Sequence, residues 1–222
     1  MYYDKTYKII LLVLIMLSYI ISFISSFIIS DIILNYFDIE GRYYINHFIG
    51  NMIVVAYTAD NVIASYTNDN FSDHNLFVAN SAVYAIHLYH IIWYYYRLRK
   101  NDLLHHGIMI GLTLPITNYF LPPDNLLGYC FFFTTGLPGG IDYLLLALVR
   151  NNIIRRDVEK EINKQINLWL RCPGCISGST LILYKLSHNY QNYTELFASL
   201  FVASTVYWNG IYYMEQIVSN QN

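Results

Sequence analysis

The sequence predicts an all-α fold, a polytopic bundle of transmembrane helices that crosses the membrane about seven times. The first observation behind this prediction is composition, because 55% of the 222 residues are hydrophobic and only 13% are charged. Soluble domains carry about 25% charged residues, so the chain has too little polar surface to cover a water-soluble globule of its size. The second observation is the repeated occurrence of long apolar segments, since a helix needs about 20 mostly apolar residues to cross the hydrocarbon core.

Seven apolar segments have the required length, and short connections separate them. They cover residues 9–30, 44–65, 76–96, 103–121, 126–149, 168–186 and 195–217. The first segment follows Lys5 and Lys8, but it is too long for a secretory signal peptide and no small-residue cleavage site follows it. We therefore expect a membrane anchor and loop in residues 1–43 and a transmembrane bundle in residues 44–222.

Residues 150–167 differ from the apolar segments, because they form an amphipathic stretch. Ile154, Val158 and Ile162 recur every fourth residue, while charged side chains occupy the other faces. This pattern predicts a helix that lies in the membrane interface and connects the fifth predicted span to the sixth.

The distribution of basic residues predicts the orientation of the chain, because cytosolic loops are enriched in lysine and arginine. Ten of the 13 lysines and arginines fall on one predicted side, in or beside the connections around residues 42, 97–100 and 150–171. This asymmetry places the C-terminus in the cytosol and the N-terminus outside or in a lumen. The two N-glycosylation sequons, Asn70-Phe-Ser72 and Asn192-Tyr-Thr194, fall on the lumenal side, whereas Lys5 and Lys8 argue against this orientation.

Polar side chains recur inside the predicted spans, where they are costly and therefore indicate a functional site. Helical spacing places several of them on common faces. We predict a cavity between the helices, in which substrate is bound by Asn51, Asn61, Asn80, His87 and His90, together with Asp102 at its mouth. The alternative is a set of hydrogen bonds between helices that only stabilise the bundle.

The fifth predicted span contains a weak point, the sequence Thr134-Thr-Gly-Leu-Pro-Gly-Gly-Ile-Asp142. Pro138 removes a backbone donor, and the glycines beside it weaken the helix. A broken helix whose freed amides hold Asp142 and a simple kink that lets helices pack closely are both compatible with this segment.

Two adjacent histidines open the fourth predicted span, in the sequence Asp102-Leu-Leu-His105-His106 after a short basic loop. Imidazole titrates near neutral pH, and a carboxylate partner such as Asp102 can fix its tautomer. The pair is therefore a candidate for acid–base or nucleophilic chemistry.

This arrangement resembles the TLC (TRAM–LAG–CLN) membrane family, which includes the ceramide synthases. The resemblance covers about residues 44–217 and depends on the number of spans, the basic loop and His105-His106. It implies a six-helix core around a cavity with an additional N-terminal helix, and it implies that His105, His106 and Asp142 are the catalytic residues. Met109 stands where the ceramide synthases have threonine, and only Asp142 remains of a second family motif.

The resemblance implies a role in lipid metabolism, lipid sensing or lipid homeostasis, with membrane lipids as partners in the endoplasmic reticulum or another endomembrane. Whether the chain is an enzyme stays open. For an enzyme, the resemblance implies acyl transfer to a lipid amine, with acyl-CoA as co-substrate and no other cofactor.

Other sequence features bear on several further functions. A net charge of −2 does not favour nucleic acid binding. Cys172-Pro-Gly-Cys175 has the spacing of a redox motif but begins a membrane span instead of following a βαβ pattern. The seven histidines are fewer than a di-iron membrane hydroxylase uses, so we expect no metal. A small transporter or channel and a non-catalytic membrane scaffold remain as alternatives.

Overall fold

The computed structural model describes residues 2–67, 73–188 and 192–219, and this part of the chain folds into helices joined by short connections. The predicted all-α fold is confirmed. The sequon Asn70-Phe-Ser72 lies outside the described residues. The helices are α1 (Tyr2–Tyr36), α2 (Arg42–Thr67), α3 (Asp73–Tyr94), η1 (Tyr95–Arg97), α4 (Lys100–Ile108), η2 (Met109–Thr113), α5 (Leu114–Phe120), α6 (Asn125–Phe131), η3 (Phe132–Gly136), α7 (Leu137–Arg150), α8 (Arg156–Ile166), η4 (Asn167–Arg171), α9 (Cys172–His188) and α10 (Tyr193–Ser219).

Four helical segments of the described chain are long and apolar enough to cross a membrane. They cover Ile10–Tyr36, Arg42–Thr67, His74–Arg97 and Asn125–Arg150, and they match four of the seven predicted spans. The chain therefore has the character of an integral membrane protein. The predicted spans 103–121, 168–186 and 195–217 are also helical, but length and composition do not place them in this group.

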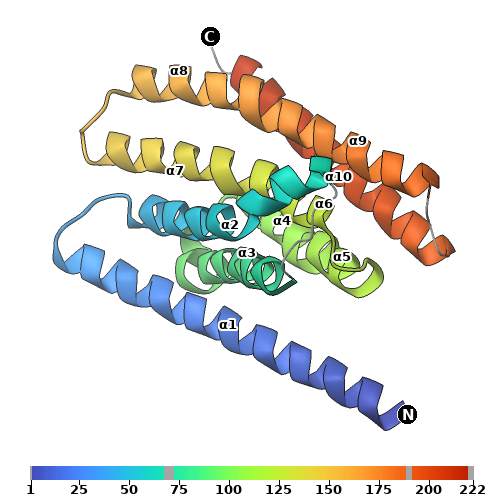
Figure 1. Ribbon diagram of the computed structural model, residues 1–222. Coiled ribbons are helices and arrows are strands. Elements are labelled where there is room, and N and C mark those ends of the chain that lie inside the picture. The colour runs from blue at the N-terminus through green and yellow to red at the C-terminus, as the bar shows by residue number, and fades with distance from the viewer. Residues whose placement is uncertain (1, 68–72, 189–191, 220–222) are drawn as a thin grey trace.

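The long helices lie side by side, with α1 along one edge of the bundle and α9 with α10 along the opposite edge (Figure 1). The side chains that α1 and α3 bury between them include Ile20, Phe27 and Ile86. On the opposite side, Cys175 of α9 and Val206 of α10 pack against Cys130 of α6. The core is thus divided between contacts of neighbouring helices, as expected for a bundle.

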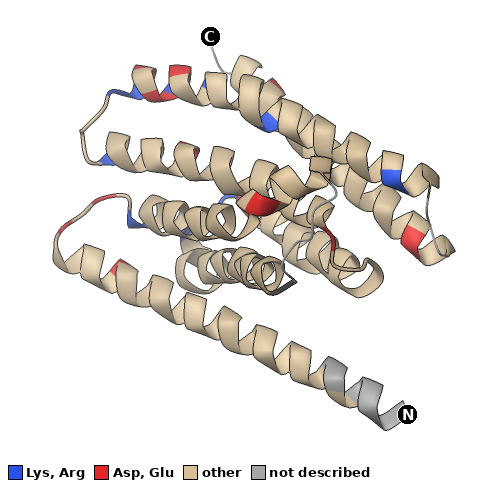
Figure 2. Ribbon diagram, in the orientation of Figure 1, with Lys and Arg blue, Asp and Glu red and all other residues tan. Residues whose placement is uncertain are grey.

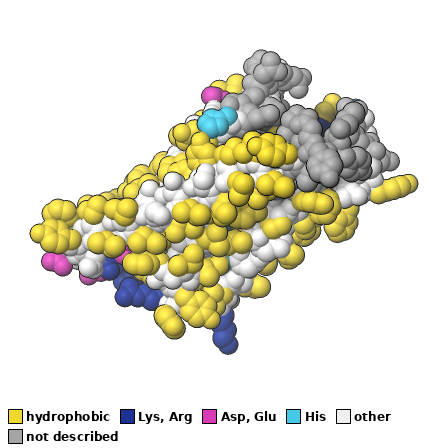
Figure 3. Space-filling model, turned by 90° about the horizontal axis from the view of Figure 1, so that it is seen from below, with side chains coloured by type: hydrophobic (Ala, Val, Ile, Leu, Met, Phe, Trp, Pro, Cys, Tyr) yellow, Lys and Arg dark blue, Asp and Glu magenta, His cyan; other side chains and the backbone are white. Residues whose placement is uncertain are grey.

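The outer surface of the bundle is strongly apolar. Large hydrophobic side chains on α1, such as Leu12, Ile21 and Ile32, are about half exposed, and the face seen in Figure 3 consists mainly of hydrophobic side chains with few charged ones. Soluble monomers rarely expose apolar patches of this extent. Lysine and arginine lie about the loop that joins α7 to α8 and at the start of α2, whereas the loop that joins α1 to α2 carries acidic residues (Figure 2). Two hydrogen bonds between Glu40 and Asn151 connect these two loops.

A buried carboxylate fastens α1 to α3. Asp31 of α1 accepts hydrogen bonds from the Tyr89 hydroxyl at 3.2 Å, from Trp93 Nε1 at 3.1 Å and from the Tyr94 hydroxyl. Arg42, at the start of α2, completes the cluster with its Nε 3.7 Å from the Asp31 carboxylate. The first helix therefore makes both apolar and polar contacts with the helices that follow it.

The predicted amphipathic helix is present as α8, but it is not a separate connector. It continues through η4 into α9, so that one helical rod runs from Arg156 to His188 (Figure 1). Cys172-Pro-Gly-Cys175 begins α9 within this rod, and both thiols are free.

Candidate functional site

A cavity of about 90 Å³ lies inside the bundle, which is room for several water molecules. The helices around it bring together histidines, small polar side chains, an arginine and two tyrosines. The lining residues are His47, Asn51, His87, His105, Met109, Thr113, Thr117, Leu127, Cys130, Phe131, Thr134, Thr135, Gly139, Tyr143, Arg171, Val202, Thr205, Val206, Asn209 and Tyr213.

Three π-helical turns border this cavity, and each contributes to its lining. Met109 and Thr113 come from η2, Thr134 and Thr135 from η3, and Arg171 from η4. Single π turns inside α-helices are rare and occur frequently at functional sites. Their convergence on one space makes the cavity the candidate functional site of the bundle.

The sequence explains these three turns. In each case a proline stands two residues after the π turn, namely Pro115, Pro138 and Pro173. A proline ring clashes with the carbonyl four residues earlier in an α-helix and has no N–H to donate to it. That carbonyl belongs to a residue of the π turn in all three cases, and the wider turn moves it away from the ring.

Five of the seven histidines of the chain form a continuous cluster beside the cavity. The His47 and His90 ring centroids lie 4.0 Å apart, and His90 lies 5.3 Å from His106. The centroid of His106 lies 5.1 Å from that of His87 and 5.5 Å from that of His105. The cluster joins α2, α3 and α4, and two of its members are held by tyrosine stacking, since His47 stacks on Tyr143 at 3.7 Å and His90 on Tyr43 at 4.2 Å.

Most of the ring nitrogens in this cluster lack a partner among the described residues. Both nitrogens of His47, His90 and His106 are buried without one. His87 is different, because its Nδ1 lies 2.7 Å from the carbonyl oxygen of Val83, one turn earlier on α3. This hydrogen bond places the proton on Nδ1 and leaves Nε2 as a free acceptor.

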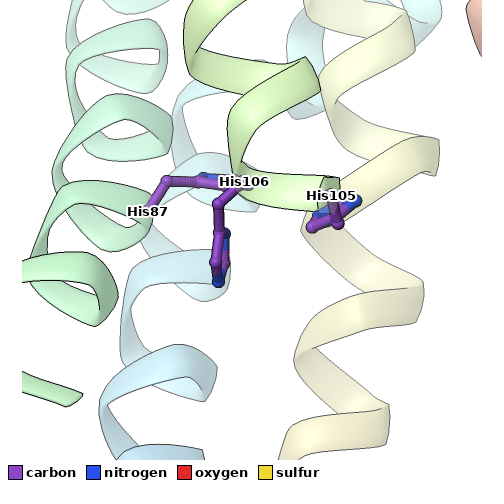
Figure 4. A group of neighbouring side chains, drawn as sticks. All are labelled: His87, His105 and His106. Atoms are coloured by element: carbon purple, nitrogen blue, oxygen red, sulfur yellow. The ribbon is translucent and has the colours of Figure 1, made fainter. Parts of the chain in front are cut away.

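The predicted catalytic pair divides between two environments. His105 lines the cavity, whereas His106 is 3% exposed and lies among the other histidines. In Figure 4 the His87 side chain reaches from α3 towards His106, and the His105 ring lies beside both, with its centroid 5.5 Å from each of theirs. Of the two, His105 is the residue in position to meet a molecule in the cavity.

Three of these histidines could hold a metal ion. Ring nitrogens of His87, His105 and His106 lie within 4.8 Å of one another, whereas nitrogens that share a tetrahedral zinc ion would lie about 3.4 Å apart. The carbonyl of Val83 would serve as the outer hydrogen-bond partner that ligating histidines commonly have. The rings would have to draw closer together to bind an ion.

Of the other predicted substrate-binding residues, Asn51 and His87 line the cavity, and the rest do not. Asn61 donates to Asn125 Oδ1 at 3.4 Å, and Asn80 donates to Asn118 Oδ1 at 2.8 Å. These two asparagines join helices, which is the role of polar residues as connections within a bundle.

Asp102 and Asp142 also lie outside the cavity lining. Asp102 accepts a hydrogen bond from the Arg99 backbone N–H at 3.0 Å and from Arg99 Nε at 3.2 Å, so it caps the start of α4. The same hydrogen bond raises the pKa of the Arg99 guanidinium. Asp142 lies on α7, with a buried Oδ1 that has no partner among the described residues.

Arg171, Tyr143 and Tyr213 also line the cavity, although the polar stripes in the sequence do not predict them. The charge distribution groups Arg171 with the basic residues of the cytosolic side, but it falls inside the predicted span 168–186. An arginine at that position is costly in a membrane and was the signal that could have identified it. Nothing in the sequence distinguishes Tyr143 and Tyr213 from the other tyrosines, of which the chain has 23 in all.

No protein-family model matches the chain, and comparisons with curated proteins and with solved structures also give no match.

Proposed function

We propose that this chain is a TLC-like protein with seven membrane spans, which binds a lipid in its central cavity and acts in lipid metabolism or homeostasis. The single observation that carries the proposal is the cavity itself, where three π turns and a histidine cluster meet inside an apolar bundle. Such a cavity suits a molecule with an apolar chain and a polar group. The proposed orientation has the C-terminus in the cytosol of an endoplasmic reticulum or other endomembrane.

The reaction that this site supports best is acyl transfer to a lipid amine, with an acyl thioester such as acyl-CoA as the second substrate. The amine nitrogen attacks the thioester carbonyl carbon, the C–S bond breaks, and the sulfur leaves as a thiolate, which takes a proton from the imidazolium of His105. His105 accepts the proton that the amine loses, because a neutral imidazole is a general base near neutral pH. His106 and His87 surround His105 and would position it.

Lipid binding is tested by mass spectrometry of lipids that remain on the full chain after purification in mild detergent. We expect an enriched lipid on the wild type and its loss in a His105→Ala/His106→Ala variant. His188→Ala is the matched control, because His188 is exposed at the end of α9 and lies outside the cavity lining. Bulk membrane lipid on all three proteins would refute the proposed cavity function.

The reaction is tested separately with a long-chain acyl-CoA and a long-chain amine. We expect amide formation by the wild type and by His188→Ala, and none by His105→Ala. Lipid binding without amide formation in the wild type would reject catalysis and retain a binding function.

A transporter is the second candidate, and one observation favours it. A smaller cavity of about 50 Å³ contains the ion pair of Lys185 with Asp124 and shares Thr117, Leu127 and Val202 with the central cavity. Two of the three shared residues are apolar, so the polar path between the cavities is interrupted. Solute flux through reconstituted vesicles, reduced by a Val202→Phe plug, would support transport over lipid binding.

A further inference from the structure

Arg171 is a buried charge that forms no ion pair with a carboxylate of the described residues. Its side chain is 4% exposed and lines the central cavity, yet none of the ion pairs among the described residues includes it. Burying a guanidinium in a bundle within a membrane is costly unless it finds an opposite charge or enough hydrogen bonds. The position therefore calls for a compensating group.

The contacts of Arg171 within the protein satisfy only part of the guanidinium. Nη1 donates to Asn167 Oδ1 at 3.0 Å, and Cζ lies 4.5 Å from the centroid of the Tyr213 ring. These contacts hold the group in one orientation, since a cation over an aromatic face is attracted to it. Nε is buried without a hydrogen-bond partner among the described residues.

A second donor lies beside the guanidinium because α7 has a glycine at this point. A Cβ atom on Gly139 would lie 2.9 Å from Asn51 Nδ2 and 3.6 Å from Arg171 Nη2, so both nitrogens border the same small space. The side-chain oxygen Oδ1 of Asn51 accepts a hydrogen bond from the Thr135 hydroxyl at 3.2 Å. This bond fixes the orientation of the amide, so that Nδ2 points the other way. Because Gly139 has no side chain, a space remains between two N–H donors, Asn51 Nδ2 and Arg171 Nη2. We call this space the cradle.

Other polar residues of the lining, Tyr143, Asn209 and Tyr213, can also donate hydrogen bonds, and the lining formed by the described residues contains no aspartate or glutamate. Donor groups around a space with one guanidinium and no carboxylate match an anion, because guanidinium and amide N–H groups bind carboxylate and phosphate oxygens strongly.

We infer that Arg171 and Asn51 bind the anionic group, a carboxylate or a phosphate, of a lipid that occupies the cavity. This inference rests on the proposed lipid-binding function and specifies its ligand class. The apolar part of the ligand lies towards Leu127, Phe131 and Val202, and the anionic group lies in the cradle at Gly139.

The competing explanation is an internal counter-charge. Asp142 lies one turn after Gly139 on α7, and within the described part of the chain its buried Oδ1 has no hydrogen-bond partner. If water links Asp142 to Arg171, the pair is self-sufficient and needs no ligand. The two explanations differ in the effect of Asp142→Asn, which removes the internal anion and retains the shape of the side chain.

The test measures binding of four probes to the delipidated full chain in mild detergent by native mass spectrometry. The probes are a long-chain fatty acid, a monoacyl phosphate, the neutral alcohol with the same chain, and inorganic phosphate alone. Charge-assisted hydrogen bonds support about tenfold to hundredfold tighter binding, so we expect that preference for at least one anionic lipid over the alcohol. The preferred lipid identifies the anion as carboxylate or phosphate.

Variants separate the cradle from the rest of the protein. Arg171→Gln and Gly139→Ala are expected to abolish the preference for the anionic lipid while the alcohol binds as before, and Arg171→Lys retains part of it. Asp142→Asn is expected to retain or strengthen anion binding. Arg150→Gln is the matched control, because Arg150 lies at the exposed end of α7, and unchanged thermal melting shows that each variant is folded.

Equal binding of the alcohol and both anionic lipids overturns the anion site and leaves lipid binding intact. Loss of anion binding in Asp142→Asn to the same extent as in Arg171→Gln overturns it in favour of the internal pair. Inorganic phosphate that displaces the lipid at equal concentration assigns the cradle to a free anion and rejects a lipid headgroup. Absence of binding by every lipid contradicts both this inference and the proposed function.

Discussion

Replacement of Asp31 by alanine tests whether the first helix is an integral part of the bundle. Asp31 is 6% exposed and accepts hydrogen bonds from Tyr89, Trp93 and Tyr94. The alanine variant leaves these donors and Arg42 without their acceptor. Because α3 carries His87 and His90, a looser contact between α1 and α3 would also disturb the histidine cluster.

The loss of unfolding free energy in Asp31→Ala depends on whether each hydrogen-bond donor can find another acceptor. A buried donor without an acceptor costs about 1–3 kcal/mol. The indole of Trp93 is 44% exposed and can turn to water or lipid headgroups, so it contributes little. Two buried tyrosine hydroxyls then give about 2–6 kcal/mol. Removing one partner of a buried ion pair usually costs about 3–5 kcal/mol, which lies within that range, so we expect a loss of unfolding free energy of about 3–5 kcal/mol.

The assay is reversible unfolding in mixed micelles of a mild and a denaturing detergent, followed by circular dichroism. Asp60→Ala is the control, because Asp60 is exposed on α2 and its removal is expected to change the unfolding free energy by less than about 0.5 kcal/mol. A loss in Asp31→Ala as small as that of Asp60→Ala would show that α1 is only attached to the bundle and that the reasoning is wrong.

Three further predictions concern the cavity and the topology. Pro138→Ala is expected to let η3 return to α-helical geometry, which rotates Thr134 away from the cavity. Lipid binding then weakens, while the melting temperature does not fall. The loop variant Pro122→Ala should bind lipid normally, and equal binding by both variants would contradict the role of the π turn. Cysteine at Lys160 is expected to react with an impermeant maleimide in sealed endomembrane vesicles, because their outer face is the cytosolic face. Background labelling is low, since Cys130, Cys172 and Cys175 are buried. Labelling only after the vesicles are opened would reverse the orientation. Elemental analysis of the purified chain is expected to find less than one metal ion per protein, because His105 acts as a base in this account, and one zinc ion per chain would instead make the histidines ligands.

The sequence predicted the helical bundle because its apolar segments are long and bilayer thickness fixes their length. It also predicted that Asn51, His87 and His105 face a common space, since polar residues inside spans are costly and gather away from lipid. It did not separate these residues from Asn61 and Asn80, which join helices. An asparagine that lines a cavity and one that links two helices look the same in a linear sequence.

The position of Arg171 and the π turns cannot be predicted from hydrophobic patterns and polar stripes. Pro115 and Pro173 impose the same distortion on two other helices as Pro138 does on the fifth predicted span. The convergence of the three turns depends on how the helices pack, and packing across helices distant in sequence leaves no local signal. The role of Asp31 also leaves no local signal. Its partners lie about 60 residues later on α3, so the sequence of the first helix alone indicates only an anchor.

The most direct test of the central claim is photochemical labelling with a long-chain fatty acid that carries a diazirine on its chain, followed by peptide mapping of the cross-linked protein. The account predicts saturable labelling of cavity residues such as Met109, Thr135 and Thr205, and competition by the unmodified lipid. Labelling confined to outward-facing residues such as Leu12 and Ile21, without saturation or competition, would contradict a lipid site inside the bundle.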